Sequence, residues 1–359
     1  MLKEIEIQNF RCFEQIKISG FERVNLIGGK NNAGKTALLE ALLLTVAPQA
    51  RTLTMLRNFR NESSKNLPAM PNRAWDTLFY APQNNKFIVI FRKEDNNNPD
   101  RLEISLNSSV NLNQVLTGEG AEKIIDYLSR DDSRFSGLTI KLTRNEQELP
   151  TSSLIAGSRG PIITNSISTT DGLPIIPSFL RISGKELTEA YDRARLDDKD
   201  SEVLKAFQIL DPTIESVESF SIGEPTLYLR RKGEKRLPLS LFGDAINRVA
   251  EIILKLVNSE YKILLVDEIE NGIHYTSQRD FWRVLFRLAV ELDTQIFATT
   301  HSLEMLQAFA YVGLELNQEC SSAYFELAKK PKTDQIIGIR RDLETLNYAL
   351  EHQKGVRGE

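Results

Sequence analysis

Residues 29 to 36 match the pattern G-x-x-x-x-G-K-[ST] without a mismatch: Gly29, Lys30, Asn31, Asn32, Ala33, Gly34, Lys35 and Thr36. In such loops, backbone N–H groups surround phosphate oxygens, helped by the positive end of the following helix. Lys35 would place a charge on the β and γ phosphates, and the Thr36 hydroxyl would bind Mg²⁺. Asn32 stands where many loops have glycine, and asparagine tolerates a left-handed backbone. The stretch therefore predicts a nucleotide-binding loop.

Two adjacent carboxylates, Asp267 and Glu268, follow the apolar stretch KILLV. They are expected at the C-terminal edge of a sheet, where open α/β sheets bind ligands. Asp267 suits a direct or water-mediated contact with Mg²⁺, and Glu268 suits the residue that orients and polarises the attacking water. Acidic residues also cap helices, but beside a phosphate loop we favour the catalytic interpretation.

The stretch QIFATTHS supplies a third candidate, His301, at the end of another apolar stretch. Ser302, the next residue, can cap the following helix. A histidine at this edge can sense a γ phosphate. The competing interpretation is a histidine that only caps or packs, and the two other motifs favour the catalytic role.

These residues require strands and helices to hold them. LKEIEIQ and QIKI predict a hairpin, RVNLI a buried strand, and residues 36–46 a helix with leucines at helical spacing. From residue 235 onward, helical patterns alternate with the strand patterns KILLVDE, TQIFATTHS and AYFELA. This alternation predicts an α/β fold with a mostly parallel sheet covered on both faces. A strand or turn and one amphipathic helix are expected after it.

The middle of the chain has a different character. Residues 50–175 are rich in Asn, Ser and Arg and contain short strand-like pieces such as KFIVIFRK and LTIKLT. Helices are expected at GKELTEAYDRARL and at DSEVLKAFQIL, which ends before Asp211-Pro212, and a hairpin at SVESFSI and TLYLRRKG. We therefore predict an N-terminal core half at 1–50, an inserted β-rich arm and helical region at 51–230, and a C-terminal core half at 231–359.

Composition limits the class of protein. The 359 residues suit two packed units or one domain with a large insertion, and the net charge of −4 excludes a global basic field. Cys12 and Cys320 match no metal or redox spacing and fit a reducing compartment. The N-terminus is unlike a signal peptide, and no apolar run approaches the roughly 20 residues that span a bilayer. A cytoplasmic protein without membrane contact is expected.

The chain resembles the ABC-type ATPase heads of the OLD (overcoming lysogenisation defect), RecF and SMC group, and especially stand-alone bacterial AAA ATPases of OLD-like type. The resemblance is carried by IEIQNFRCFEQIKI, GGKNNAGKTALLEAL, LPLSLFGDAINR, LLVDEIENGIH and FATTHS. It implies that Arg11 lies near the adenine or phosphates. Ser240 and Gly243 match the degenerate signature segment, and Asn271 lies in the D-loop.

The resemblance also implies a mechanism. Two copies would meet head to tail with ATP and Mg²⁺ between them, giving a homodimer or higher homo-oligomer that closes with ATP and opens on hydrolysis. Lys35, Thr36, Asp267, Glu268 and His301 would act in cis, whereas Ser240, Gly243 and Asn271 would approach from the partner. The chain departs from the group in having LSLFGD where LSGGQ is common. It also lacks long heptad runs and an acidic Toprim cluster, so the nuclease half of OLD enzymes is expected to be absent.

Three functions follow from this sequence. The first is an ATPase that gates a separate effector, expected to be a nuclease, in antiphage defence. The second is a RecF/SMC-like DNA-binding ATPase in DNA repair, for which RTLTMLRNFR and LRRKGEKR are candidate contacts unless they are ordinary solvated surface. The third is a nucleotide-binding module with little hydrolysis, against which Glu268 and His301 argue.

Overall fold

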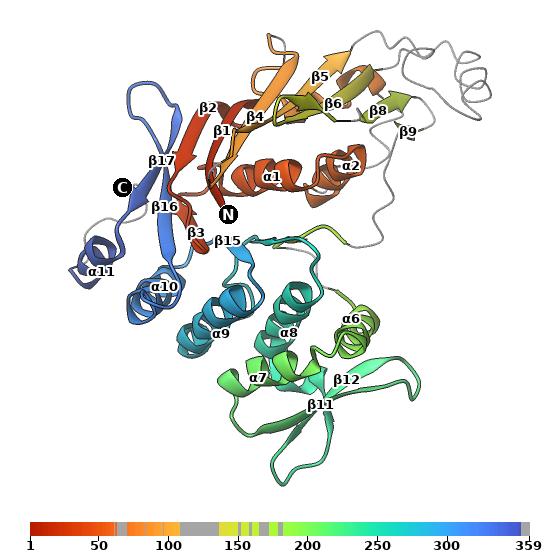
Figure 1. The fold of residues 1–359 in the computed structure, drawn as a ribbon, viewed down its shortest axis with the longest axis vertical. Helices are drawn as coiled ribbons and strands as arrows, with labels where there is room; N and C mark the ends of the chain where they lie inside the picture. The colour runs from red at the N-terminus through yellow and green to blue at the C-terminus, as the bar shows by residue number, and fades with distance from the viewer. Residues whose placement is uncertain are drawn as a thin grey trace.

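The computed structural model describes residues 1–60, 62, 70–82, 84–95, 97–107, 136–149, 152–157, 160–164, 172–178 and 182–352. This part of the chain forms an antiparallel sheet and a mostly parallel sheet with a helix between them, and a smaller lobe beyond the second sheet (Figure 1).

The mostly parallel sheet lies at the centre. Its order is β10 (Ile175–Ile176), β14 (Ile263–Val266), β15 (Gln295–Thr299), β3 (Val24–Gly29), β16 (Ser322–Lys329) and β17 (Ile336–Arg341). All neighbours are parallel except β16 and β17. Strands β3, β14 and β15 are buried along their whole length, which explains their near-continuous apolar sequence. The predicted α/β sheet and its three C-terminal strands are confirmed.

Helices cover both faces of this sheet (Figure 1). On one face lie α1 (Lys35–Val46) and α2 (Ala50–Phe59); on the other lie α8 (Gly243–Val257), α9 (Gln278–Glu291) and α10 (Leu303–Glu315), with α11 (Leu343–Glu351) beside α10. Helix α1 touches strands of both sheets, so it is apolar on nearly all sides. The expected helix at 36–46 is therefore buried from Ala37 to Thr45.

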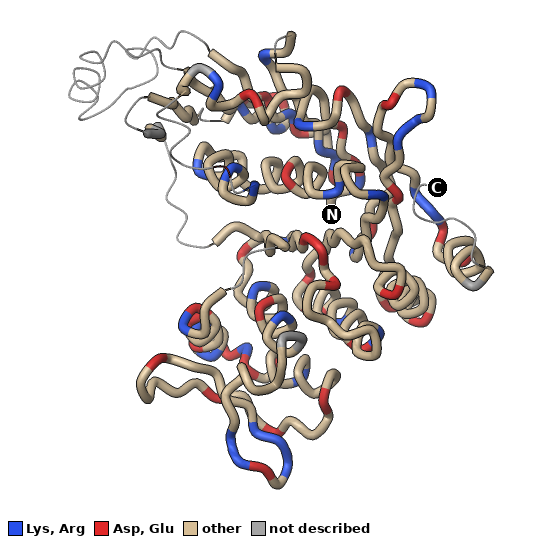
Figure 2. The backbone as a smooth tube through the Cα atoms, turned by 180° about the vertical axis from the view of Figure 1, so that it is seen from behind, with Lys and Arg blue, Asp and Glu red and all other residues tan. Residues whose placement is uncertain are grey.

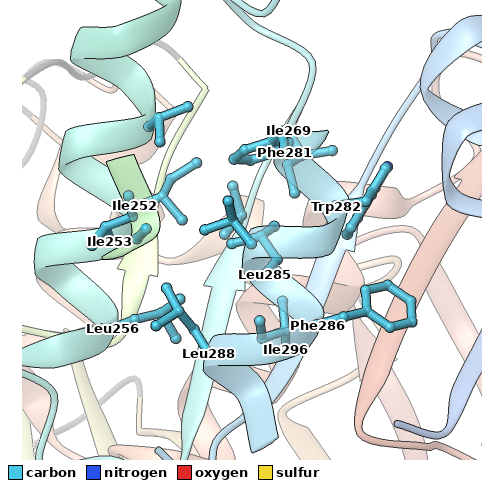
Figure 3. Close-up of a cluster of buried hydrophobic side chains, with 14 of the residues drawn as sticks. Ile252, Ile253, Leu256, Ile269, Phe281, Trp282, Leu285, Phe286, Leu288 and Ile296 are labelled. Carbon is cyan, nitrogen blue, oxygen red and sulfur yellow. The ribbon is translucent and has the colours of Figure 1, made fainter. Parts of the chain in front are cut away.

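A large apolar cluster fixes α8 and α9 against the central sheet (Figure 3). It includes Ile252, Ile253, Leu256, Ile269, Phe281, Trp282, Leu285, Phe286, Leu288 and Ile296. Burying a side chain of this size stabilises the fold by about 1.5–3 kcal/mol. The Trp282 indole N–H also donates to the carbonyl oxygen of Met305 at 3.3 Å, which links α9 to α10. The cluster thus holds α9, which follows β14, and the Trp282 bond ties it to α10, which follows β15. Both helices position the loops at the ends of those strands.

The antiparallel sheet contains the predicted N-terminal hairpin. Its order is β2 (Phe13–Ser19), β1 (Leu2–Phe10), β4 (Phe87–Glu94), β5 (Asp100–Asn107), β6 (Ser136–Arg144), β8 (Ser152–Gly157) and β9 (Gly160–Thr164), with β7 (Gln147–Glu148) paired to β6. Strand β4 pairs directly with β1, and Ile7 lies opposite Ile90.

This pairing changes the interpretation of the expected arm. Its strands continue the sheet of the hairpin rather than forming a separate sheet, because buried isoleucines of β1 and β4 share one face. Residues 108–135 of the expected arm lie outside the described residues. The boundaries at residues 50 and 230 stay predictions.

The smaller lobe is formed by the middle of the chain. It contains α6 (Gly184–Leu196), α7 (Asp200–Leu210), β11 (Ile214–Phe220), β12 (Thr226–Arg231), β13 (Leu237–Pro238) and the 3-10 helix η3 (Leu239–Phe242), which leads into α8. Shorter 3-10 helices are η1 (Pro71–Arg73), η2 (Asp76–Leu78) and η4 (Tyr275–Ser277). Both predicted helices and the predicted hairpin are confirmed, and α7 ends just before Asp211-Pro212.

The first helix of this lobe begins with a capping box. The Ser183 hydroxyl accepts from the Glu186 N–H, and the Glu186 carboxylate accepts from the Ser183 N–H. The expected strand and helix near the C-terminus are β17 and α11. None of the helices in the described part of the chain has the length and apolar character needed to cross a bilayer.

Candidate active site

The predicted phosphate loop joins β3 to α1. Gly29 has φ 138°, and a Cβ atom there would collide with the Leu327 carbonyl oxygen. Asn32 has φ 63°, so the left-handed backbone expected at this asparagine is confirmed. Lys30 and Asn31 are exposed in the loop, and Ala33 is buried beneath it. Gly34 is the N-cap of α1 and lies against the Phe13 ring of the N-terminal hairpin.

Lys35 folds back over this loop. Its Nζ donates to the Gly29 carbonyl oxygen at 2.8 Å and to the Lys30 carbonyl oxygen at 3.0 Å. Burial lowers the pKa of Lys35, and the negative charges of Asp267, Glu270 and Glu268 act in the opposite direction. The ammonium group is therefore held between the loop and a group of carboxylates.

Thr36, Asp267 and Thr299 form a hydrogen-bonded group of oxygens. The Asp267 carboxylate accepts from the Thr299 hydroxyl at 2.6 Å and from the Thr36 hydroxyl at 3.1 Å. Asp267 is only 6% exposed, and burial raises the pKa of its carboxyl although both hydroxyl groups oppose the shift. Oxygen donors of this kind are what Mg²⁺ prefers, so Thr36 and Asp267 fit the predicted metal site.

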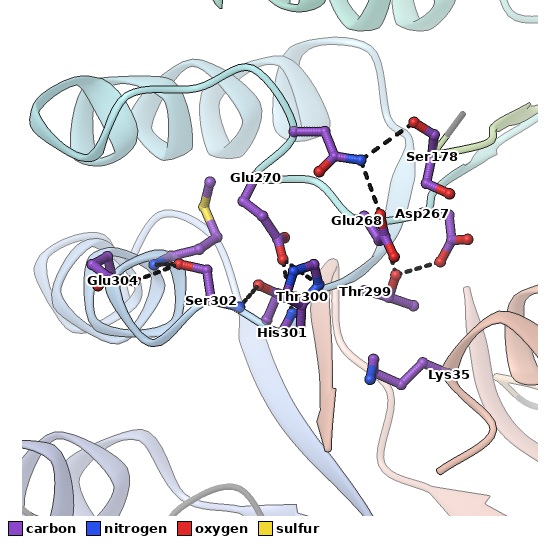
Figure 4. Close-up of polar contacts among 12 residues, drawn as sticks. Lys35, Ser178, Asp267, Glu268, Glu270, Thr299, Thr300, His301, Ser302 and Glu304 are labelled. Atoms are coloured by element: carbon purple, nitrogen blue, oxygen red, sulfur yellow. Dashed lines mark hydrogen bonds and ion pairs between the residues drawn. The ribbon is translucent and has the colours of Figure 1, made fainter. Parts of the chain in front are cut away.

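Glu268 follows Asp267 in a left-handed backbone conformation, with φ 48°. Its N–H donates to the Thr299 hydroxyl at 2.9 Å, and its carboxylate accepts from the Asn271 amide at 3.0 Å (Figure 4). Asn271 also donates to the Ser178 carbonyl oxygen at 3.3 Å. Asn271 thus contacts Glu268 of its own chain, with which it shares one tight turn. Its approach to a partner chain stays a prediction.

A cavity of about 180 Å³ opens beside these carboxylates. Thr36, Asp267 and Glu268 line it together with Glu40 and Arg60. Arg60 was not found from the sequence. The Glu40 carboxylate accepts from the Arg60 Nε at 2.8 Å and from its Nη2 at 3.1 Å. Burial acts to lower the pKa of Arg60, but the hydrogen bonds and charge of Glu40 raise it, so a permanent positive charge lines the cavity.

Arg11 is paired with Glu40, a residue of the cavity wall. Its Nε donates to the buried Glu40 carboxylate at 2.9 Å, and its Nη1 donates to the Thr77 carbonyl oxygen at 2.9 Å. The side chain is 7% exposed. Because Glu40 is buried inside an apolar helix, it needs cationic partners, and Arg11 is one of them. The expected contact of Arg11 with adenine or phosphate stays a prediction.

His301 is held by Glu270, which the sequence analysis also missed. One Glu270 oxygen lies 2.9 Å from the His301 Nδ1 and accepts the His301 backbone N–H at 2.8 Å (Figure 4). Glu270 is 10% exposed in its side chain, whereas the imidazole is half exposed. A carboxylate on Nδ1 fixes the ring so that Nε2 is the nitrogen available to a ligand. The only hint in the sequence is a third acidic residue in DEIEN.

This geometry makes Glu270 a positioning residue for His301. A Glu270→Ala variant is expected to lower kcat for ATP hydrolysis by about 10- to 100-fold, the size seen when a residue orienting a functional histidine is lost. KM should change little. Glu270→Gln should recover part of the rate, because its amide oxygen can still accept both N–H groups.

The control is a double-mutant cycle with His301→Ala. If Glu270 acts through His301, the double variant is no slower than His301→Ala alone. Additive losses would show that Glu270 has a separate role.

Ser240 lies in the smaller lobe and Gly243 at the start of α8, both away from the loop. Ser240 is exposed in η3, and Gly243 begins α8 with φ 87°. The described contacts bring neither to the phosphate loop. The structure thus brings Thr36, Asp267, Glu268, Lys35 and His301 to one sheet edge and leaves the signature segment apart.

The two basic segments are mostly engaged in ion pairs. In α2, Arg57 contacts Glu62 and the Ala74 carbonyl oxygen, and Arg60 binds Glu40. Near β12, Arg230, Arg231 and Arg236 pair with Glu215, Asp211 and Glu218. In Figure 2 the turn after β12 is mostly positive, and its acidic partners come from neighbouring segments of the lobe. Neither segment is a basic patch free of acidic partners.

Comparisons with known proteins show the family of this chain. A family model described as "AAA domain, putative AbiEii toxin, Type IV TA system" matches residues 24–306. The chain is 25% identical over 391 aligned positions to an "ATP/GTP phosphatase" of Helicobacter pylori, covering 100% of both chains. It is also 48% identical, over 44 residues, to the "DNA double-strand break repair Rad50 ATPase" of Archaeoglobus fulgidus, covering 12% of this chain and 5% of that protein.

A solved structure shows the same fold. It is titled "Crystal structure of the SmcHead bound to the C-winged helix domain of ScpA" and aligns with a TM-score of 0.50 and 11% identity. The alignment covers 96% of this chain and 98% of that chain. The expected ATPase-head fold is confirmed.

Proposed function

This chain belongs to the AAA domain family described as putative AbiEii toxin, Type IV TA system, and has a RecF/SMC-type ATPase core; on that premise we propose that it hydrolyses ATP to ADP and phosphate. One observation carries the proposal: the Thr36 hydroxyl lies 3.1 Å from the Asp267 carboxylate, directly beside Glu268. The description of the Helicobacter pylori relative as an ATP/GTP phosphatase supports it.

Each residue of the site has a role in the proposed ATP hydrolysis. The loop N–H groups and Lys35 bind the phosphates. Glu268 orients a water molecule and accepts its proton as the water oxygen bonds to the γ phosphorus; the bond from that phosphorus to the bridging oxygen breaks, and ADP leaves. Mg²⁺ held by Thr36 and Asp267 would neutralise phosphate charge. His301, held by Glu270 at Nδ1, would offer its Nε2 to the γ phosphate. Phosphate release from ATP with Mg²⁺, and its loss with EDTA, tests the proposal; no release overturns it.

We further propose that ATP joins two copies head to tail. Ser240 is exposed in the smaller lobe and does not line the cavity beside Asp267 and Glu268, which supports a nucleotide contact from another copy. The exposed Leu241 and Tyr275, at 69% and 65%, offer apolar surface near Ser240 and the D-loop for such a contact.

Mixing two inactive variants tests this arrangement. Ser240→Arg blocks the signature segment, and Glu268→Gln removes the catalytic base. Each alone is expected to be inactive, but an equal mixture should recover about one quarter of the wild-type rate, because half of the dimers are mixed and each has one intact site. A mixture as inactive as its components would exclude a shared site, provided that light scattering shows dimers.

The finer biological role is a further proposal: the ATP-bound dimer controls a separate effector, expected to be a nuclease, in antiphage defence. The OLD-like resemblance of the sequence supports it, as does a family description that names a toxin of a toxin–antitoxin system. The test is plasmid cleavage by this chain together with the product of the neighbouring gene. Cleavage that needs both proteins and ATP supports the proposal. Salt-sensitive DNA binding by this chain alone would instead favour the repair ATPase.

A further inference from the structure

A cavity of about 360 Å³ lies in the smaller lobe, between α6, β12, η3 and α8. Much of its wall is apolar, and the rest carries hydroxyl, amide and charged groups. The lining residues that matter here are Ile182, Leu187, Leu227, Leu239, Ser240 and Arg248. Its volume is within the range of small-molecule sites, and its combination of apolar walls with few polar groups is typical of them.

Arg248 in this wall is buried, and two of its three guanidinium nitrogens have no hydrogen-bond partner among the described residues. The side chain is 3% exposed, and its Nη1 donates to the Glu251 carboxylate at 2.9 Å. Its Nε and Nη2 have no hydrogen-bond partner among the described residues. Leaving buried charged donors unpaired is costly, so such groups are usually satisfied by a protein atom, water or a ligand.

The two unused nitrogens form one edge of the planar guanidinium. Their N–H bonds are parallel, so this edge can bind a carboxylate or phosphate in a bidentate manner, through two hydrogen bonds. Glu251 already offsets part of the positive charge. A monoanion therefore suits the site better than a dianionic phosphate, and the apolar wall suits a hydrocarbon body.

We propose that this cavity binds a small organic carboxylate, with its carboxylate on the Nε and Nη2 edge of Arg248 and its hydrocarbon part against Leu187, Leu227 and Leu239. Both nitrogens are covered by neighbouring atoms. The carboxylate therefore reaches them through rotation of a side chain in the wall. Ser240 lies in the same wall, so the ligand sits beside the signature segment. The proposal does not depend on ATP hydrolysis.

Hexanoate is a suitable probe, and hexanamide is its neutral match. In thermal unfolding of the full chain at constant ionic strength, hexanoate should raise Tm saturably, by roughly 2–4 °C at tenfold excess over Kd, and hexanamide should not. Arg248→Lys keeps the positive charge but lacks the two parallel N–H donors, so the hexanoate-dependent rise in Tm should disappear. Calorimetric titration should give one site per chain.

A second variant closes the cavity and leaves Arg248 intact. A Cβ atom at Gly184, in the wall, would meet only the Pro225 carbonyl oxygen, at 3.8 Å. Gly184→Phe should therefore fold and lose the hexanoate response, while Lys185→Phe, one residue along on the exposed surface, should keep it. If wild type gives no saturable shift, or if Arg248→Lys or Gly184→Phe responds as wild type does, water alone satisfies the guanidinium and the proposal is wrong.

Discussion

A Glu268→Gln variant is expected to release phosphate from ATP about 10²- to 10⁴-fold more slowly than the wild-type chain, because an amide cannot accept a proton from the attacking water. The exchange changes almost no volume. The Asn271 amide that donates to the Glu268 carboxylate at 3.0 Å can still donate to the new amide oxygen. The lower rate should therefore reflect the missing proton acceptor and not a change in the structure of the turn that holds Glu268.

Nucleotide binding should survive the same change. Lys35 and the loop N–H groups are untouched, and so is the hydroxyl of Thr36 beside Asp267. ATP should thus stay bound and, on the proposed mechanism, the dimer should accumulate, as a mass measurement with ATP against ADP would show. Glu319→Gln makes the same chemical change at an exposed position and should leave the rate unchanged. A normal rate in Glu268→Gln would show that another group activates the water.

The part of the site that could be predicted lies in short contiguous patterns. The residue pattern from Gly29 to Thr36 is by itself enough to predict a phosphate-binding loop. Asp267 and Glu268 directly follow a strand that is clearly apolar in sequence. Parallel neighbours end at the same sheet edge, which is why β14 and β15 bring Thr299 to 2.6 Å from Asp267. The same rule explains why His301 lies at this edge.

The missed residues depend on partners far away in the sequence. Glu40 stands in the apolar run ALLEALLL, and no local pattern tells that Arg11 and Arg60 meet there. A lone carboxylate in a buried helix does signal that some cation must reach it. Likewise, the alternation of apolar and polar residues predicts that β1 and β4 are strands, but it does not tell which strands pair with each other. The continuity of the hairpin with the expected arm was therefore visible only in the structure.

Glu40 should also account for a large part of the stability of the chain. Its carboxylate is completely buried in α1, the helix that starts at the phosphate loop, and it accepts from Arg11 and Arg60 at 2.9 and 2.8 Å. Replacing a buried charged group with well-packed apolar residues can be neutral, but removing one partner leaves the other charge uncompensated. Arg11, at 7% exposed, has little access to water that could replace Glu40.

We expect Glu40→Ala to lower the free energy of unfolding by about 3–5 kcal/mol, measured by urea denaturation. Glu189→Ala is the matched control, because Glu189 is a helical carboxylate that is 58% exposed and pairs with Lys185; its loss should cost about 0–1 kcal/mol. Adding Arg11→Met to Glu40→Ala should restore part of the stability, since it removes a buried charge whose remaining ion pair, with Glu62, is longer, at 3.7 Å. Equal losses in Glu40→Ala and Glu189→Ala would mean that water satisfies Arg11 and Arg60, and that the ion pairs do not hold α1 and the cavity wall together.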